Sequence, residues 1–417
     1  MIRRAYKNHR ETIHNFIWRC LQLVGKQGII TLIFILCARL LTPYDFGIYN
    51  YALAIIFFLI TFGDFGISAA TSKYVAEYHV SNKDKLKAVP FNSAIIILGL
   101  TLIISILTIL IGPWYLKDKY GYVLWLLPLI FIAPMTSLYD GIYRGLKKFK
   151  QLAIISLIVG TCSLSFVYIL INNYGLTGAL IAQDLFYLIL FLSLGFGYRE
   201  FHFKWNWGVI REVGRYSMIV GLVNAGFFLY TTMNSIILGK FGYIAEVGYY
   251  ELINKVFLFL TLPFSIIGQV IAPDITNLAS KNDFNQIQNK FKKTFFILLL
   301  LGILFSILLY LFLPLVLRTY LPKYSTPEFN VMFNIMLFTL PFTIVSGTMS
   351  QGFTIAAGKA KYGLLTIPFG VLNLVLGVIL INLIGFIGVI ISFLISSTIS
   401  RGWSFLLVYR GIGNSKK

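Results

Sequence analysis

The chain has 417 residues, of which 58% are hydrophobic and only 12% are charged, and its mean hydropathy is +0.81. Soluble domains carry roughly 25% charged residues, so this composition excludes a soluble globular protein. The formal net charge is +20, but the basic residues lie between apolar runs, which favours the membrane surface over nucleic acid as their partner.

The long apolar runs predict an all-α integral membrane protein with about twelve transmembrane helices. A helical span needs about 20 mostly apolar residues, and unbroken runs exclude a β-barrel, whose strands would alternate. In chain order the predicted spans are 16–41, 46–68, 88–112, 122–143, 151–172, 176–198, 214–239, 246–272, 291–317, 329–357, 362–382 and 385–409.

Basic residues are concentrated on one side of the predicted spans. That side carries Arg3, Arg4, Lys7, Arg10, Lys73, Lys83, Lys85, Lys87, Arg144, Lys147, Lys148, Lys150, Arg199, Lys204, Arg211, Arg215, Lys281, Lys290, Lys292, Lys293, Lys359, Lys361, Arg410, Lys416 and Lys417. The opposite loops hold only Lys117, Lys119, Lys240, Arg318 and Lys323. Cytoplasmic loops are enriched in Lys and Arg, so both termini are predicted to be cytoplasmic.

The second half of the chain repeats the first. "INNYGLTGALIA" from Ile171 matches "INLIGFIGVIIS" from Ile381, and Gly47 matches Gly248, each before an aromatic-rich helix. The repeat predicts two six-helix bundles, residues 1–200 and 201–417, with a linker near Arg199–Arg211. Because each half has an even number of spans, the two bundles are parallel repeats, an arrangement found in transporters.

Two stretches resemble the polysaccharide-export flippases of the multidrug/oligosaccharidyl-lipid/polysaccharide (MOP) exporter superfamily. They are "LLTPYDFGIYNYALAIIFFLITFGDFGISAATSKYVAEY" from Leu40 and "YDGIYRGLKKFKQLAII" from Tyr139. The resemblance implies a V-shaped pair of bundles in the bacterial inner membrane, or the archaeal plasma membrane. It also implies alternating access, and a cargo of polyprenyl-diphosphate-linked oligosaccharide such as an O-antigen, capsule or exopolysaccharide repeat unit. Membrane lipids and polysaccharide polymerase or assembly proteins are the expected partners.

Charged residues inside spans mark candidate sites, because burying a charge in lipid is expensive. Arg19, Gln22 and Lys26 share one face of the first span and predict a basic stripe that receives the diphosphate. For Arg19 the alternative is a contact with cytoplasmic headgroups. Asn224 belongs to a small polar stripe on the seventh span, for which helix packing is the alternative. That stripe comprises Ser217, Gly221, Asn224, Thr231 and Ser235.

Acidic residues in the spans are candidates for gating or for coupling to H⁺ or Na⁺. Glu251 lies one turn before Lys255 in the eighth span, so Lys255 is either half of an ion pair or a ligand of the cargo. Asp64 lies at a predicted bend and either titrates with a gate or caps the following helix. Asp184 lies deeper, and no local partner is evident in the sequence.

Two other functions remain as alternatives. One is a small-molecule exporter on the same fold, which would favour acids and aromatics in its cavity rather than cations. The other is a lipid-linked sugar polymerase or glycosyltransferase, which needs acidic residues in a sizeable external loop. The longest predicted external loop, near 317–329, holds one acid, Glu328. We therefore expect no enzyme activity and no cofactor.

The predicted topology can be tested with reporters that are active only in the cytoplasm. Fusions at Lys148, Lys204 and Lys417 should be active, and fusions at Lys119 and Lys323 should be silent. Activity at both sets of positions would contradict the twelve-helix count.

Overall fold

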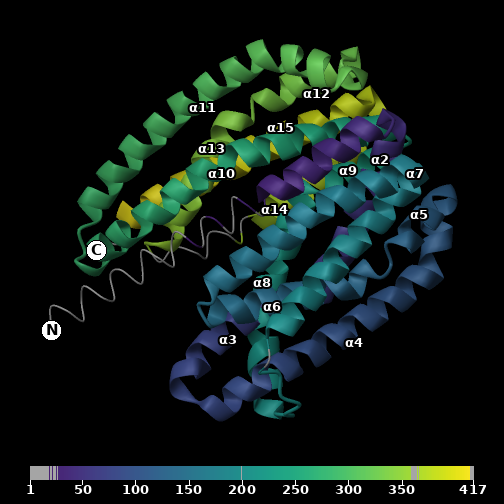
Figure 1. Ribbon diagram of the computed structural model, residues 1–417. Coiled ribbons are helices and arrows are strands. Elements are labelled where there is room, and N and C mark those ends of the chain that lie inside the picture. The colour runs from purple at the N-terminus through teal and green to yellow at the C-terminus, as the bar shows by residue number, and fades with distance from the viewer. Residues whose placement is uncertain are drawn as a thin grey trace. The chain divides into compact units, whose positions relative to one another are not determined.

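The computed structural model describes residues 27–198, 200–357 and 366–413, together with Trp18, Leu21, Gly25 and Leu364. Within these residues the regular elements are all helices (Figure 1). They are Gln27–Leu40, α2 (Pro43–Asp64), α3 (Ile67–Ser81), α4 (Lys83–Leu116), η1 (Lys117–Lys119), α5 (Tyr120–Trp125), α6 (Leu129–Gly145), α7 (Phe149–Gly197), α8 (Trp207–Thr231), α9 (Met233–Lys240), α10 (Ile244–Ser280), α11 (Phe284–Tyr320), η2 (Pro322–Tyr324), α12 (Pro327–Leu337), α13 (Leu340–Met349), η3 (Ser350–Ile355), α14 (Thr366–Ile384) and α15 (Phe386–Gly413). The predicted all-α membrane fold is confirmed.

The helix lengths agree with the predicted spans. Among the described residues, seven helices are long and apolar enough to cross a membrane, and nine if two bent pairs count as one span each. The bent pairs are α8 with α9, at 47°, and α12 with the following helix, at 44°. The long helix α7 covers two predicted spans, and α6 and Gln27–Leu40 coincide with the remaining two.

The chain reverses inside α7 at a glycine. Gly175 has φ +54° and ψ −130°, which L side chains rarely adopt. A Cβ at Gly178 would lie 2.0 Å from the carbonyl oxygen of Leu170. Leu170 and Gly178 would be about 12 Å apart along a straight helix, so this closeness shows that two antiparallel helices meet here almost without a loop.

The second repeat turns in the same way between α14 and α15. Gly385 has φ +67°, and a Cβ at Gly388 would lie 2.3 Å from the carbonyl oxygen of Leu380. These residues occupy the positions that the aligned stretches predicted. Both halves therefore use one glycine for the turn and a second, three residues later, for the close approach of two helices.

The chain divides into two compact units. Unit 1 contains the chain up to Ala225 apart from Thr42–Gly47, and unit 2 contains Thr42–Gly47 together with the chain from Gly226 onward. The start of α2 and the remainder of α2 therefore belong to different units, and α8 contributes to both. The boundary between the two sequence repeats, predicted between residues 200 and 201, stays a prediction.

The start of α2 is fixed in unit 2 by aromatic and glycine contacts. Phe46 is fully buried and meets Tyr324 edge-on, with ring centroids 5.9 Å apart. A Cβ at Gly47 would lie 1.9 Å from the carbonyl oxygen of Ile244, at the first residue of α10. Gly248 faces Phe46 and Gly47 in turn, so the two repeat-matched glycines lie against each other.

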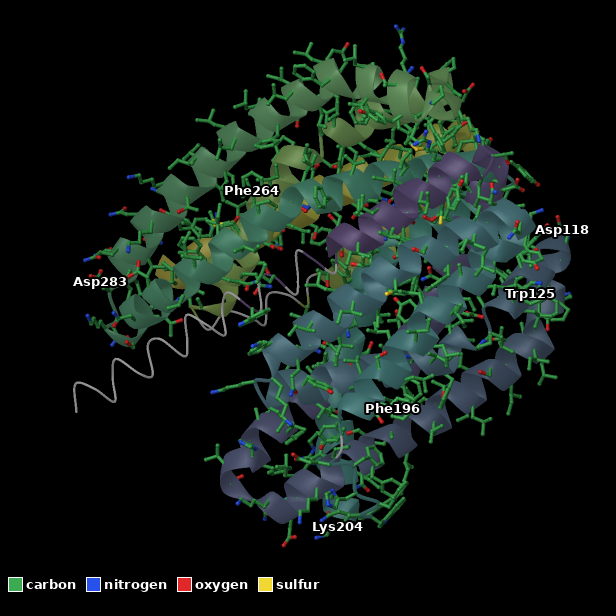
Figure 2. All side chains as sticks on the ribbon, viewed as in Figure 1. Asp118, Trp125, Phe196, Lys204, Phe264 and Asp283 are labelled. Carbon is green, nitrogen blue, oxygen red and sulfur yellow. The ribbon has the colours of Figure 1, made fainter. Side chains whose placement is uncertain are left out.

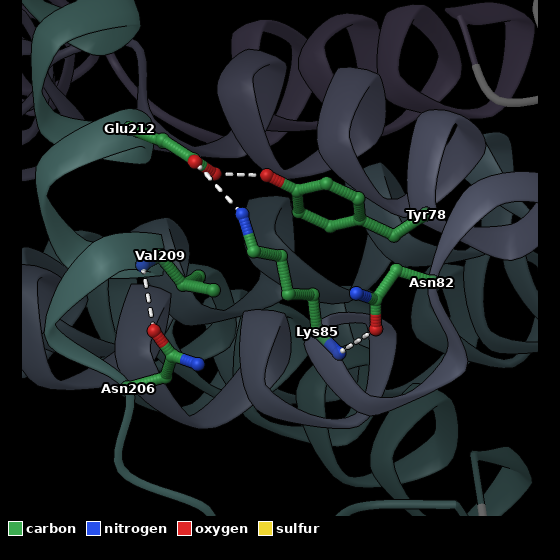
Figure 3. A network of polar contacts seen from close by, with 6 residues as sticks. All are labelled: Tyr78, Asn82, Lys85, Asn206, Val209 and Glu212. Carbon is green, nitrogen blue, oxygen red and sulfur yellow. Dashed lines mark hydrogen bonds and ion pairs between the residues drawn. The ribbon is translucent and has the colours of Figure 1, made fainter.

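The first turns of α8 are fixed in unit 1 by a polar network (Figure 3). Lys85 Nζ lies 2.9 Å from Glu212 Oε1, and the Tyr78 hydroxyl donates to the other oxygen of the same carboxylate. Nearby, Lys73 lies over the ring of Tyr216, 4.3 Å from its centroid. Side chains from α3 and α4 thus hold α8 through both charge and ring contacts.

The hairpin at Gly175 should tolerate no side chain at Gly178. Gly178→Ala pushes a methyl into the Leu170 carbonyl and should cost about 1–3 kcal/mol of stability, as overpacking usually does. Thermal unfolding in detergent measures the effect.

The matched control is Gly99→Ala in α4, where nothing lies within 4 Å of the new Cβ. It should leave the melting temperature unchanged or raise it slightly. Equal destabilisation by the two substitutions would show that the hairpin is not tightly packed.

Candidate functional site

The predicted basic stripe on the first span lies outside the described residues. Arg19, Gln22 and Lys26 therefore have no structural account, and their role stays a prediction.

In unit 2, Glu251 is held by a neighbouring helix. Ser235 Oγ of α9 donates a 2.6 Å hydrogen bond to Glu251 Oε1, and the Glu251 side chain is half-buried. Lys255 follows one turn later on α10 and is also half-buried. The structure therefore places an acid and a base on one helix beside α9, while their mutual pairing stays a prediction.

Next to Glu251 lies a chain of buried polar side chains. Asn234 Nδ2 donates to the Tyr250 hydroxyl at 2.8 Å, and Asn373 Nδ2 donates to Asn234 Oδ1 at 2.9 Å. Ser392 Oγ lies 3.3 Å from Asn373 Oδ1, and all four residues are fully buried. The network joins α9, α10, α14 and α15. Such fully bonded networks hold a bundle in one arrangement.

Unit 2 also contains a cation that the sequence analysis missed. Arg401 lies in α15, and its Nη1 donates to the carbonyl oxygen of Thr339 at 3.2 Å. Its guanidinium carbon lies 6.0 Å from the ring centroid of Tyr230. Thr339 lies at the break between α12 and α13, so Arg401 adds a charged donor where the helix is interrupted. A single basic residue within "SSTISRGWSF" was the available signal.

In unit 1 the matching tyrosine uses a different partner. Tyr49 follows Gly47 by two residues, as Tyr250 follows Gly248. The Tyr49 hydroxyl donates to Gln183 Oε1 at 3.0 Å. Each repeat thus bonds the same tyrosine within its own bundle through different side chains.

Asp184 follows Gln183 on α7. Its Oδ1 atom is buried, and within the described part of the chain it has no hydrogen-bond partner. A buried carboxylate oxygen without a donor is expensive in a membrane, and such groups mark sites of proton or ion exchange. The coupling role of Asp184 stays a prediction.

Asp64 caps a helix. Its Oδ1 accepts a hydrogen bond from the backbone N–H of Ser68 at 3.1 Å, and its Oδ2 accepts one from the Ser68 hydroxyl at 2.8 Å. Gly66, with φ +80°, makes the break between α2 and α3. These contacts agree with the capping interpretation, and a gating role stays a prediction.

The small polar stripe on the seventh span is packed at its start and exposed at Asn224. A Cβ at Gly221 would lie 2.7 Å from the ring and carbonyl oxygen of Phe65, and Ser217 is buried beside it. The first part of the stripe therefore packs against the α2–α3 break. Asn224 is exposed, and its role in binding a ligand stays a prediction. Separately, Asp140 and Arg144 form an ion pair one turn apart on α6, with Arg144 Nε 2.7 Å from Asp140 Oδ2.

The contact of Arg401 with the broken helix yields a prediction. Arg401→Gln removes a charged hydrogen bond and a ring contact, and should cost about 1.5–3 kcal/mol. Thermal unfolding in detergent measures it. The control is Arg410→Gln, an exposed arginine on the same helix, which should melt like the unaltered protein. If both variants melt alike, Arg401 does not support the break.

The sequence matches a known protein family and a relative of similar length. The sequence profile of the family described as "Polysaccharide biosynthesis protein" matches residues 13–279. An uncharacterized membrane protein of Methanocaldococcus jannaschii is 26% identical over 404 residues, covering 89% of this chain and 91% of that protein.

Solved structures show the same fold. The inward-facing conformation of a multidrug resistance MATE family transporter of the MOP superfamily has a TM-score of 0.76 at 16% identity, covering 95% of each chain. The bent form of the Vibrio cholerae MATE transporter VcmN has a TM-score of 0.60 at 16% identity, covering 98% of this chain and 99% of that one. This chain is therefore a multi-pass membrane transporter with the two-bundle MOP fold, and it belongs to the polysaccharide biosynthesis protein family.

Proposed function

We propose that the protein flips a polyprenyl-diphosphate-linked oligosaccharide from the cytoplasmic to the outer leaflet by alternating access. The cargo is a repeat unit of an O-antigen, capsule or exopolysaccharide. The family match over residues 13–279 is the observation that carries this proposal. The protein acts without catalysis, in the inner or plasma membrane with both termini in the cytoplasm, beside a polysaccharide polymerase or assembly protein.

The cations within the spans favour the proposal that the cargo is an anion. A diphosphate carries about two negative charges and loses hydration when it leaves the headgroup region, so nearby cations must replace part of that stabilisation. Lys255 and Arg401 supply positive charge within α10 and α15. In the proposal the diphosphate is bound by Lys255 of α10, and by Arg19, Gln22 and Lys26 of the first span.

Polar and acidic residues have separate roles in this proposal. Asn224 donates to the sugar or the phosphate from its exposed position on α8. Glu251 releases Lys255 to the cargo, while Asp184 exchanges H⁺ or Na⁺. Asp64 lies where α2 ends, so its hydrogen bonds to Ser68 would open and close as the two helices bend.

A second candidate function is export of small cationic molecules. The observation that favours it is the buried Asp184 oxygen, which has no hydrogen-bond donor among the described residues. A carboxylate in that state attracts a cation or a proton. The two functions differ in the charge of their cargo, so one assay can separate them.

The test uses purified protein in vesicles that carry a lipid-linked oligosaccharide in both leaflets. A glycan-cleaving enzyme added outside digests only the outer leaflet, so further digestion measures flipping. Lys255→Ala should slow flipping about tenfold or more, which corresponds to about 1.4 kcal/mol or more of lost binding to the moving diphosphate.

The matched control is Lys281→Ala, which removes the same charge from an exposed position at the end of α10. It should flip at the unaltered rate. Vesicles that accumulate a fluorescent organic cation but never flip the glycolipid would favour the second candidate. Vesicles that do neither would contradict both proposals.

A further inference from the structure

The segment that joins α7 to α8 has a regular pattern of side chains. It reads "EFHFKWNW" from Glu200 to Trp207, so aromatic residues alternate with polar ones. The backbone from Glu200 to Asn206 is not helical, although long helices adjoin the segment. A flexible connecting segment would be expected to contain small polar residues rather than four large rings.

The backbone of this segment is bonded firmly to unit 1. Asn92 of α4 is fully buried, and its Nδ2 donates to the carbonyl oxygen of Lys204 at 2.8 Å. Its Oδ1 accepts from the backbone N–H of Asn206 at 3.1 Å. Asn206 in turn caps α8 by accepting from Val209 N at 3.1 Å (Figure 3). One buried amide therefore fixes where the segment lies and where α8 begins.

A polar side chain of the segment bonds to the start of α4. Lys204 Nζ lies 3.1 Å from Asp84 Oδ1, and the Asp84 side chain is largely exposed while that of Lys204 is about half exposed. His202 is also exposed and bonds the carbonyl oxygen of Glu200. Water solvates these groups at little cost.

The aromatic side chains form two clusters that remain open to the surroundings. Phe201 and Phe203 both contact Phe91 of α4, while Trp205 stacks on Trp207 with centroids 6.0 Å apart. Nevertheless Phe203 is 83% exposed, Trp207 68% and Trp205 57%. Rings that are held in place but uncovered need a partner outside the chain.

The surroundings identify that partner. Phe196, in the last turn of the lipid-spanning α7, is 80% exposed, and Figure 2 shows it and Lys204 in the same part of unit 1. Lys83 and Lys87 are exposed at the start of α4, which this segment contacts through Asn92. Trp and Tyr rings gather at the headgroup level of membranes, and Lys favours anionic headgroups there.

We infer that residues 200–207 form a strap that binds the membrane interface. The rings of Phe203, Trp205 and Trp207 enter the boundary between headgroups and acyl chains, while His202 and Lys204 remain in water. The strap thereby fixes the depth of unit 1 and of the first turn of α8 in the bilayer. This inference does not depend on which cargo the protein carries.

The experiment uses the full-length protein in phosphatidylcholine–phosphatidylglycerol vesicles with Trp205 as the only tryptophan, the other five being changed to Phe. Its fluorescence should be quenched by lipids brominated near the headgroup end of the acyl chains. We expect this quenching to exceed that by acrylamide in water about threefold, as for a ring at the interface. The matched control carries His202→Trp with all six native tryptophans changed to Phe, and should show the reverse preference.

A second pair of variants covers the case in which the tryptophan substitutions prevent folding. Phe203→Cys should react slowly with a membrane-impermeant maleimide in vesicles, and His202→Cys should react fast. Trp205 quenched mainly by acrylamide, or two cysteines that react equally fast, would overturn the inference. Such results would show that the rings face water, where a sugar or a protein partner would meet them.

Discussion

The fold depends on one constraint: hydrocarbon offers no water to hydrogen-bond the backbone, so each N–H and C=O must find its partner within the protein. Helices meet this requirement, and the structure shows how the chain manages where they stop. Gly175 and Gly385 reverse the chain almost without a loop. Where α2 ends, Asp64 bonds the first turn of α3, and where α12 ends, Arg401 bonds the Thr339 carbonyl. Two charged residues thus support helix breaks, and for Asp64 the sequence alone allowed a gating role as well as a cap.

The sequence predicted the helices well because hydropathy and turn chemistry are local properties. Even the second glycine of each hairpin was visible, since "NYGLTG" and "LIGFIG" align residue for residue. Arg401, Asn234 and Asn373 were missed for a physical reason. Each is bonded by a helix distant in sequence, and an apolar run does not show what faces it. Asp64 was ambiguous for the same reason, because a cap and a gate require the same residue at the same place.

The buried polar groups of unit 2 combine rigidity with charge. The network from Tyr250 to Ser392 joins four helices through fully bonded amides and hydroxyls, which favours motion of the bundle as one piece. Glu251 and Lys255 lie on the same helix α10, one turn apart and beyond Tyr250. A charge that exchanges partners works best on such a rigid support, because its position then changes little while its partner changes.

The position of Phe46 has a consequence for how the protein is made. Its ring packs on Tyr324, which leaves the ribosome 278 residues later. At about 5–20 residues per second, the first part of α2 waits tens of seconds for its aromatic neighbour. During synthesis the start of α2 can therefore pack on α10 before its ring contact with Tyr324 forms, and that contact closes only once η2 has emerged. A nascent chain that stops before η2 would leave the Tyr324 side of the Phe46 ring uncovered, a mark by which the cell's quality control could distinguish an unfinished transporter from a complete one.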